Sequence, residues 1–175
     1  MKKIVAFFSL LYLLSACWPT SLSFRDGSMD ERWQKFYVTT LENSAANAPL
    51  SYAATLTEDV RTGLQNNTRL KLSTNKEDAQ VQIEGNVIHY QVTPAAIQQG
   101  DNAAKNRLTI SVKFTIFINV PPKEGGQQQD EMELTATRFQ DFEASQDLTS
   151  VEAVLIDDID KQIVQDVVNK LMSNW

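Results

Sequence analysis

Apolar side chains occupy every second position between Arg107 and Val120, and threonine, serine and lysine fill several positions between them. A strand with this period has one face on a core and one face in water, which is typical of antiparallel sheets. Stretches rich in alternating, aromatic or β-branched residues predict further strands at 33–41, 81–92 and 132–142, with a brief one at 69–73. The sequence therefore predicts a sheet with one buried face and one solvent-exposed face.

The segment 81–92 contains a change of phase. Its apolar side chains follow one alternation up to Val87 and the opposite one from Ile88 onward. One extra residue in a strand produces such a shift, which is the effect of a β-bulge. Because glycine often marks a bulge, we expect it at Gly85-Asn86.

An amphipathic helix is predicted at 50–64. Ala53, Leu56, Val60 and Leu64 recur at steps of three and four residues. The loop that ends in Pro49 precedes it, and proline suits a helix start.

A longer helix is predicted from 151 to about 172. Thr149 and Glu152 have the spacing of a capping box at its start. The expected apolar positions are Val151, Val154, Leu155, Ile156, Ile159, Ile163, Val167, Val168 and Leu171. Together with the strands, these helices give the order β-α-β-β-β-α. We expect an α+β fold, a two-layer sandwich with two helices on one face of a mostly antiparallel four-stranded sheet.

The first seventeen residues have the order of a lipoprotein signal. Lys2 and Lys3 precede an apolar run at 4–14, which is too short to span a bilayer but fits the apolar core of a secretory signal. Leu14-Ser-Ala-Cys17 follows at once, and the Cys17 thiol can be alkylated with diacylglycerol. We expect 1–16 to be a cleaved signal peptide and Cys17 to carry diacylglycerol and an N-acyl chain such as palmitate.

The same pattern divides the rest of the chain. Residues 17–32 lack a sustained period and predict a lipidated tether, and 33–175 predicts a single domain. No early acidic residue follows Cys17, so we expect the outer membrane, on its periplasmic side.

Composition narrows the possible functions. Cys17 is the only cysteine, so an intramolecular disulfide and a multi-cysteine metal site are excluded. The net charge is −6, and cleavage would remove two lysines to leave about −8. An acidic chain argues against nucleic-acid binding, which needs a basic surface.

Residues for catalysis or metal binding do not form a motif. His89 is the only histidine and falls in a predicted strand, where a structural role is favoured. Asp157, Asp158 and Asp160 lack the spacing and glycine turn of a calcium loop and indicate a solvated helix face. Gly125-Gly126 precedes no helix and is interpreted as a loop tip. We therefore expect no enzyme activity, no metal and no cofactor.

Basic side chains near the longest strand are candidates for anion binding. Lys113 and Thr115 belong to its wet face, while Lys105, Arg107 and Lys123 lie near its ends. Such a group could receive a phosphorylated glycolipid, although ordinary solubilising charge explains each residue singly. The polar loops 98–105 and 123–130 are long enough to contact a partner.

The chain resembles the lipopolysaccharide-assembly lipoproteins, the LptE-like family, in its Bacteroidetes form. The similarity covers most of 33–175 and depends on the order of several short motifs. These are Cys17, Ala48-Pro-Leu-Ser51, Leu56-Thr-Glu-Asp-Val60, Thr68-Arg-Leu-Lys-Leu72, Glu84-Gly85 with Ile88-x-Tyr90, Asn106-Arg-Leu-Thr-Ile-Ser-Val112, Phe139-Gln-Asp-Phe142, Ile163-Val-Gln-Asp-Val-Val-Asn-Lys170 and Trp175.

This resemblance implies a fold of two helices on a four-stranded sheet and a function without catalysis. It also implies partnership with an LptD-like β-barrel, in which the protein acts as a plug during insertion of lipopolysaccharide into the outer membrane. Lys105, Arg107 and Lys123 are the candidates for lipopolysaccharide contact. The rival hypothesis is a periplasmic lipoprotein that binds a ligand or serves another secretion or envelope complex, as a pilotin does.

Overall fold

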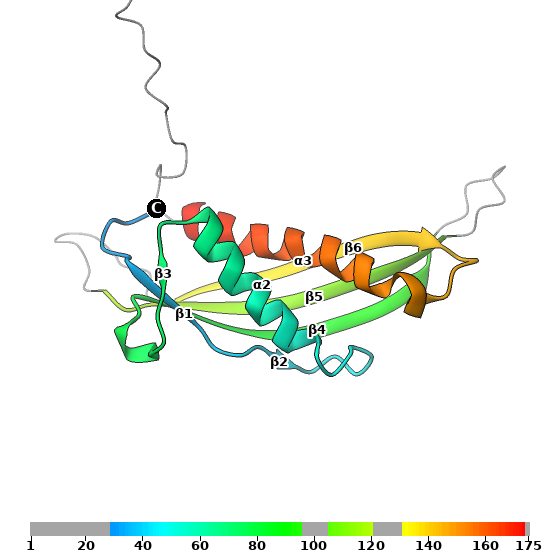
Figure 1. The fold of residues 1–175 in the computed structure, drawn as a ribbon, viewed down its shortest axis with the longest axis horizontal. Coiled ribbons are helices and arrows are strands. Elements are labelled where there is room, and N and C mark those ends of the chain that lie inside the picture. The colour runs from blue at the N-terminus through cyan, green and yellow to red at the C-terminus, as the bar shows by residue number, and fades with distance from the viewer. Residues whose placement is uncertain (1–28, 96–104, 121–130, 174–175) are drawn as a thin grey trace, which may run out of the picture.

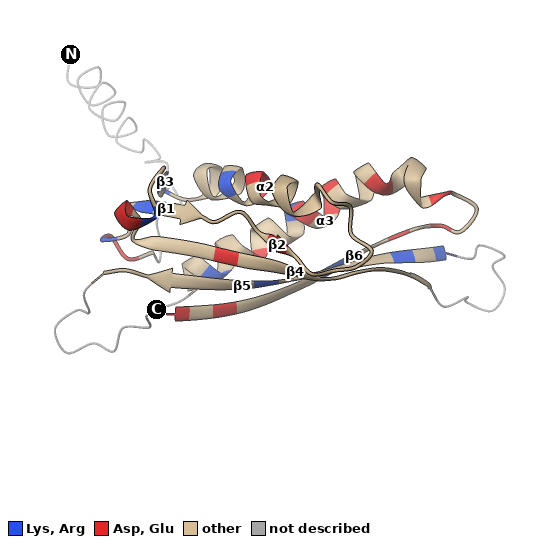
Figure 2. Cartoon of the chain, turned by 90° about the horizontal axis from the view of Figure 1, so that it is seen from below, with Lys and Arg blue, Asp and Glu red and all other residues tan. Residues whose placement is uncertain are grey.

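In the computed structural model, two helices cover one face of a twisted six-stranded sheet (Figure 1). The structure describes residues 29–95, 105–120 and 131–173. Seen from another side, the helices lie on a single side of the sheet (Figure 2). The expected α+β sandwich is confirmed, although the sheet has more strands than the sequence predicted.

Three long strands form an antiparallel meander. They are β4 (Val81–Pro94), β5 (Lys105–Ile118) and β6 (Glu131–Glu143), and β5 lies between the other two. Each long strand includes most of its predicted segment. On β5 the predicted alternation is confirmed, because the side chains of Leu108, Ile110 and Phe114 are buried on the helix side.

The remaining strands are short and parallel to their neighbours. β1 (Lys35–Val38) pairs with β4 and with β3 (Lys71–Leu72), and β2 (Glu42–Asn43) pairs with β4. The prediction of a four-stranded sheet was wrong. β3 lies within the predicted brief strand at 69–73, but β2 was not predicted, because a two-residue strand is too short to leave a period in the sequence. A 3-10 turn, η2 (Lys76–Asp78), precedes β4.

The β-bulge of β4 lies further along the strand than predicted. The register with β5 shifts between Val87 and His89, so Ile88 is the extra residue. Gly85 has a packing role instead. A Cβ there would lie 2.9 Å from Cδ1 of Phe114 and 3.1 Å from Cγ of Leu41, so the glycine makes room for two core side chains.

The helices α2 (Tyr52–Asn67) and α3 (Leu148–Ser173) agree with the predicted segments apart from their ends. The predicted capping box is wrong because α3 begins before Thr149. The Thr149 hydroxyl donates to the Asp147 carboxylate, and Glu152 accepts a hydrogen bond from the Tyr90 hydroxyl at 2.5 Å. Val154 was expected in the core but is 66% exposed.

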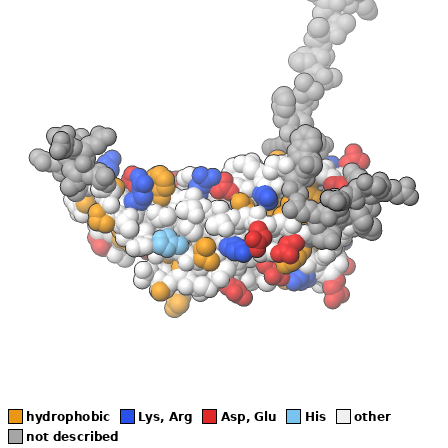
Figure 3. All heavy atoms as spheres, turned by 180° about the vertical axis from the view of Figure 1, so that it is seen from behind, with side chains coloured by type: hydrophobic (Ala, Val, Ile, Leu, Met, Phe, Trp, Pro, Cys, Tyr) orange, Lys and Arg blue, Asp and Glu red, His pale blue; other side chains and the backbone are white. Residues whose placement is uncertain are grey.

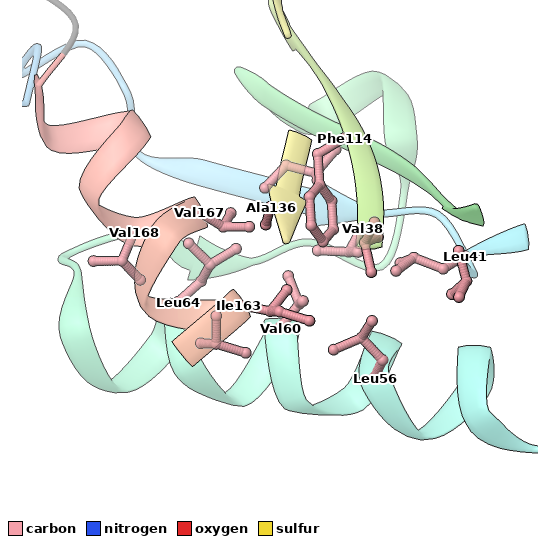
Figure 4. Close-up of a cluster of buried hydrophobic side chains, with 14 of the residues drawn as sticks. Val38, Leu41, Leu56, Val60, Leu64, Phe114, Ala136, Ile163, Val167 and Val168 are labelled. Atoms are coloured by element: carbon pink, nitrogen blue, oxygen red, sulfur yellow. The ribbon is translucent and has the colours of Figure 1, made fainter. Parts of the chain in front are cut away.

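The core lies between the helices and the sheet (Figure 4). Leu56, Val60 and Leu64 of α2 point toward the sheet, as predicted, and Phe114 comes to meet them from β5. The helices approach each other closely at Gly63, where a Cβ would lie 2.1 Å from Cγ1 of Val164. This packing leaves the opposite face of the sheet uncovered by the described helices.

Candidate functional site: the open face of the sheet

Lys105 and Arg107, two of the predicted anion-binding residues, lie together at the start of β5 on the open face. Arg107 donates two hydrogen bonds to Asp141 on β6, at 2.6 and 3.0 Å, and its guanidinium carbon lies 3.8 Å from the ring centre of Phe139. The amine of Lys105 is 3.8 Å from a carboxylate oxygen of Glu143. Both cations therefore have acidic neighbours on the adjacent strand.

Arg107 and Asp141 each stabilise the charged form of the other. The hydrogen bonds from Arg107 hold the pKa of Asp141 below its ordinary value, despite the opposing effect of burial. The carboxylate therefore stays ionised and occupies the two donors with which arginine would otherwise bind a phosphate. An anionic ligand that binds Arg107 through these same two donors has to displace Asp141.

Two further cations of this face are also paired. The Lys113 amine lies 2.6 Å from Glu133, and the Lys76 amine lies 2.8 Å from Glu84. In Figure 3, blue and red side chains are scattered over this face instead of forming one basic patch. Of the predicted site residues, Lys123 and Cys17 lie outside the described residues, as does the predicted loop tip Gly125-Gly126.

Uncharged polar groups fill the middle of the open face. The hydroxyls of Ser111 and Thr137 are 2.9 Å apart on neighbouring strands. His89 is exposed beside them on β4, opposite Ser111 in the register, and is the pale blue side chain in Figure 3. The described residues contain no group of three His, Cys, Asp or Glu side chains placed to hold a metal ion.

A shallow hollow of about 430 Å³ lies beside the bulge of β4. It is lined by Thr39, Thr40, Glu42, Glu84, Gly85, Asn86, Ile88, Lys113 and Thr115. Ile88 is 46% exposed because the bulge removes it from the core alternation. Thr39 Oγ1 and Asn86 Oδ1 are buried at this hollow without a hydrogen-bond partner among the described residues. The hollow thus combines one apolar side chain with unsatisfied polar atoms.

Asp160 is the polar residue that the sequence analysis placed wrongly. It was assigned to a solvated helix face, yet its side chain is on the buried side of α3 and the residue is only 2% exposed. Tyr52 donates a hydrogen bond to Oδ1 at 2.7 Å, whereas Oδ2 has no partner among the described residues. Asp157 and Asp158 do face solvent, where Lys161 lies between them.

The surroundings of Asp160 favour its protonated form. Burial is the main cause that raises its pKa to about 7, and the negative charges of Asp59 and Asp157 raise it further, while the hydrogen bond from Tyr52 opposes them. The Tyr52 ring also packs edge-on against Tyr90, with 5.8 Å between ring centres. The signal in the sequence was the position of Asp160, one residue after Ile159 and three before Ile163 on the apolar stripe.

Residues 33–171 match the lipopolysaccharide-assembly (LptE) family. The chain belongs to this family. The match covers nearly the whole domain, so the resemblance based on short motifs is confirmed. LptE proteins are accessory lipoproteins of lipopolysaccharide assembly. No curated protein matches the sequence.

Solved structures are similar to the domain of this LptE protein. The hypothetical protein CT253 from Chlamydia trachomatis matches with a TM-score of 0.52 and 10% identity, over 81% of this chain and 99% of that one. The uncharacterized lipoprotein B from Nitrosomonas europaea has a TM-score of 0.49 and 16% identity, over 81% of this chain and 83% of that one. At these identities the first likeness supports the fold alone.

Neither of the described helices of this LptE domain is long and apolar enough to cross a bilayer. Membrane attachment through Cys17 stays a prediction.

Proposed function

We propose that this LptE protein is a non-enzymatic, lipid-anchored factor of the outer membrane that partners an LptD-like β-barrel in lipopolysaccharide insertion. The observation that carries the proposal is the family match over residues 33–171. The amino-terminal signal supports it, because Cys17 is placed to receive the acyl chains that would hold the domain on the periplasmic side of the outer membrane.

The open face supports a role in contact with polar surroundings. Its cations and acids are balanced by the pairs Arg107–Asp141 and Lys113–Glu133, and hydroxyl groups lie between them. Such a surface is compatible with the water-filled interior of a large barrel, where a broad apolar surface would be disfavoured.

Direct lipopolysaccharide contact is a second part of the proposal. Lys105 and Arg107 are adjacent on the open face, and Lys123 follows β5 in the sequence. A phosphate has to compete with Asp141 and Glu143 for the first two cations. We therefore expect weak binding by the isolated domain and stronger binding by the variant Asp141→Asn, measured with purified lipopolysaccharide in detergent.

The test of the partnership is a pull-down of the full-length protein from detergent-solubilised membranes. One large barrel protein, recovered in about equal amount, is expected. The variant Cys17→Ala serves as the control, because it should keep the folded domain while it loses the lipid. Recovery of the wild-type protein without a barrel contradicts the proposal.

The hollow beside Ile88 favours one alternative, a periplasmic lipoprotein that binds a ligand or serves another secretion or envelope complex. Its unsatisfied atoms, Thr39 Oγ1 and Asn86 Oδ1, could bind a small polar group or water. The same pull-down distinguishes this function, because a different dominant partner would then be recovered.

A further inference from the structure

The two edges of the sheet differ greatly in length. The sheet order β3-β1-β4-β5-β6 places the two-residue β3 at one edge and the thirteen-residue β6 at the other. At about 3.3 Å per residue, β6 presents an edge of roughly 40 Å. A long edge strand is a template for pairing with another chain.

Two backbone hydrogen bonds at the ends of β5 show which backbone groups of β6 face outward. Asn119 donates to the carbonyl of Gln80, and Ala95 donates to the carbonyl of Lys105, so the odd-numbered residues of β5 bond to β4. Because the direction alternates along an antiparallel strand, the even-numbered residues of β5 bond to β6. In the observed register, Asn106 is opposite Phe142, so the even-numbered residues of β6 complete these bonds.

The odd-numbered residues of β6, from Glu131 to Glu143, therefore direct their N–H and C=O groups away from the sheet. Among the described residues, the carbonyl of Glu143 accepts a hydrogen bond from the Gln146 N–H at 2.9 Å, and the outward groups from Glu131 to Asp141 have no hydrogen-bond partner. The edge thus offers six pairing positions, at alternate residues from Glu131 to Asp141, to an added strand.

The side chains of the same positions argue against pairing with a second copy. In a symmetric antiparallel pair centred on Thr137, Glu131 would face Glu143 of the other copy and Glu133 would face Asp141. Like charges directly opposite each other destabilise a sheet, and the net charge of −6 adds further repulsion. The acidic ends of β6 instead complement a different strand that carries basic or uncharged side chains at its ends.

We propose that the free edge of β6 is an interaction surface that pairs with an extended segment of the barrel partner, which adds a seventh strand to the sheet. This inference rests on the proposed partnership with a barrel. Main-chain hydrogen bonds along the edge supply affinity, and the acidic ends favour a segment with complementary charge. The middle of the edge, around Thr135 and Thr137, accepts uncharged side chains.

Thr135 is the best position for a test. It is exposed, its side chain makes no hydrogen bond or ion pair with the described residues, and its N–H points outward. The variant Thr135→Pro removes this N–H without breaking a bond to β5, whereas Thr135→Val removes the hydroxyl and keeps the N–H. If the edge pairs with the barrel, proline lowers the affinity about tenfold and valine changes it less than twofold.

The experiment uses the full-length lipidated protein, expressed with the barrel protein of the same cells and purified in detergent. Affinity is measured for the wild-type protein, Thr135→Pro and Thr135→Val. Amide hydrogen exchange is then measured residue by residue on the wild-type protein, alone and in the complex. We expect the amides of Thr135, Thr137 and Phe139 to become protected in the complex, while those of Leu134 and Ala136 are protected in both samples.

The outcomes separate the two proposals. A barrel that binds wild-type and proline variants equally, with unprotected outward amides, overturns the edge pairing and leaves the partnership intact. Failure of the wild-type protein to bind any barrel overturns both. Dimers of the isolated protein that protect the same amides also overturn the inference, because the occupant is then a second copy. If Thr135→Pro fails to fold, the exchange measurement on the wild-type complex decides.

Discussion

The two faces of the sheet are built from alternate residues of the same strands, yet their chemistry is opposite. On β5, Phe114 points into the core and is fully buried, while its neighbour Lys113 points outward to an ion pair with Glu133. The covered face is close-packed, as shown by the approach of Gly63 to Val164. The open face contains balanced charges, hydroxyls and a few exposed apolar groups.

This difference separates stability from binding. Removal of apolar surface from water supplies most of the folding free energy, so the covered face determines whether the domain folds. The open face contributes little to folding and is therefore free to meet a partner. The two faces should respond very differently to matched substitutions.

The largest effect is expected at Phe114. The variant Phe114→Ala should lower the free energy of unfolding by about 3 to 5 kcal/mol, because it leaves a cavity in the core. The matched variant on the open face, Phe139→Ala, should cost about 1 kcal/mol or less, since Phe139 is 48% exposed. Urea unfolding measures the loss of unfolding free energy in both variants. Equal losses would contradict the proposed difference between the two faces.

The next effect concerns Asp160 and depends on pH. Its folded-state pKa of about 7 exceeds the ordinary value of 3.8, so the folded protein keeps a proton that the unfolded chain has lost. Stability should therefore fall as pH rises from about 4 to 7 and then level off. The total loss from this group should be up to about 4 kcal/mol, because folding raises the pKa from 3.8 to about 7.

The variant Asp160→Asn removes this dependence and should be the more stable protein at pH 8. Urea unfolding between pH 4 and pH 8 measures the difference. Asp158→Asn, an exposed acid on the same helix, is the control and should follow the wild-type curve. Parallel curves for Asp160→Asn and the wild-type protein would show that the buried carboxyl stays charged.

A smaller effect is expected at the contact between the helices. Gly63→Ala should lower stability by about 1 to 2 kcal/mol, because the new Cβ cannot fit beside Val164. In the background of Val164→Ala, the same change should be neutral or stabilising, since alanine favours a helix over glycine by about 1 kcal/mol. Thermal or urea unfolding of the four proteins gives the coupling. Additive effects would show that the contact tolerates a methyl group.

The smallest effect is expected on the open face at Lys113. The variant Lys113→Met breaks the ion pair with Glu133 and should change stability by less than about 1 kcal/mol, because exposed pairs contribute little. The same urea titration detects it. A larger loss would mean that the open face contributes to folding more than its exposure suggests.

Much of the fold could be predicted from the sequence because its long elements repeat one period many times. The alternation on β5 and the spacing of Leu56, Val60 and Leu64 determine which side is buried. β3 lies within the predicted brief strand at 69–73, whereas the two-residue β2 could not be predicted, because its pairing with β4 depends on long-range contacts. The predicted position of the bulge was wrong for a similar reason, because Gly85 is required by its long-range contact with Phe114 in the core.

The candidate site was predicted only in part. The sequence brought Lys105 and Arg107 to one end of β5, but it gave no register with β6, so their neighbours Glu143 and Asp141 were not foreseen. A basic side chain can be judged as an anion-binding residue only when its acidic neighbours are known, because they compete with the anion for the same donors. The outward amides of β6 were also beyond the sequence, because their direction follows from hydrogen bonds at the ends of β5.

The most direct test of the account is depletion of the protein in its own cells, followed by measurement of surface lipopolysaccharide and of the mature barrel protein. Both quantities should fall and should recover with the wild-type gene, while Cys17→Ala should restore neither fully. Normal lipopolysaccharide and normal barrel maturation after depletion would contradict the proposed role in lipopolysaccharide assembly.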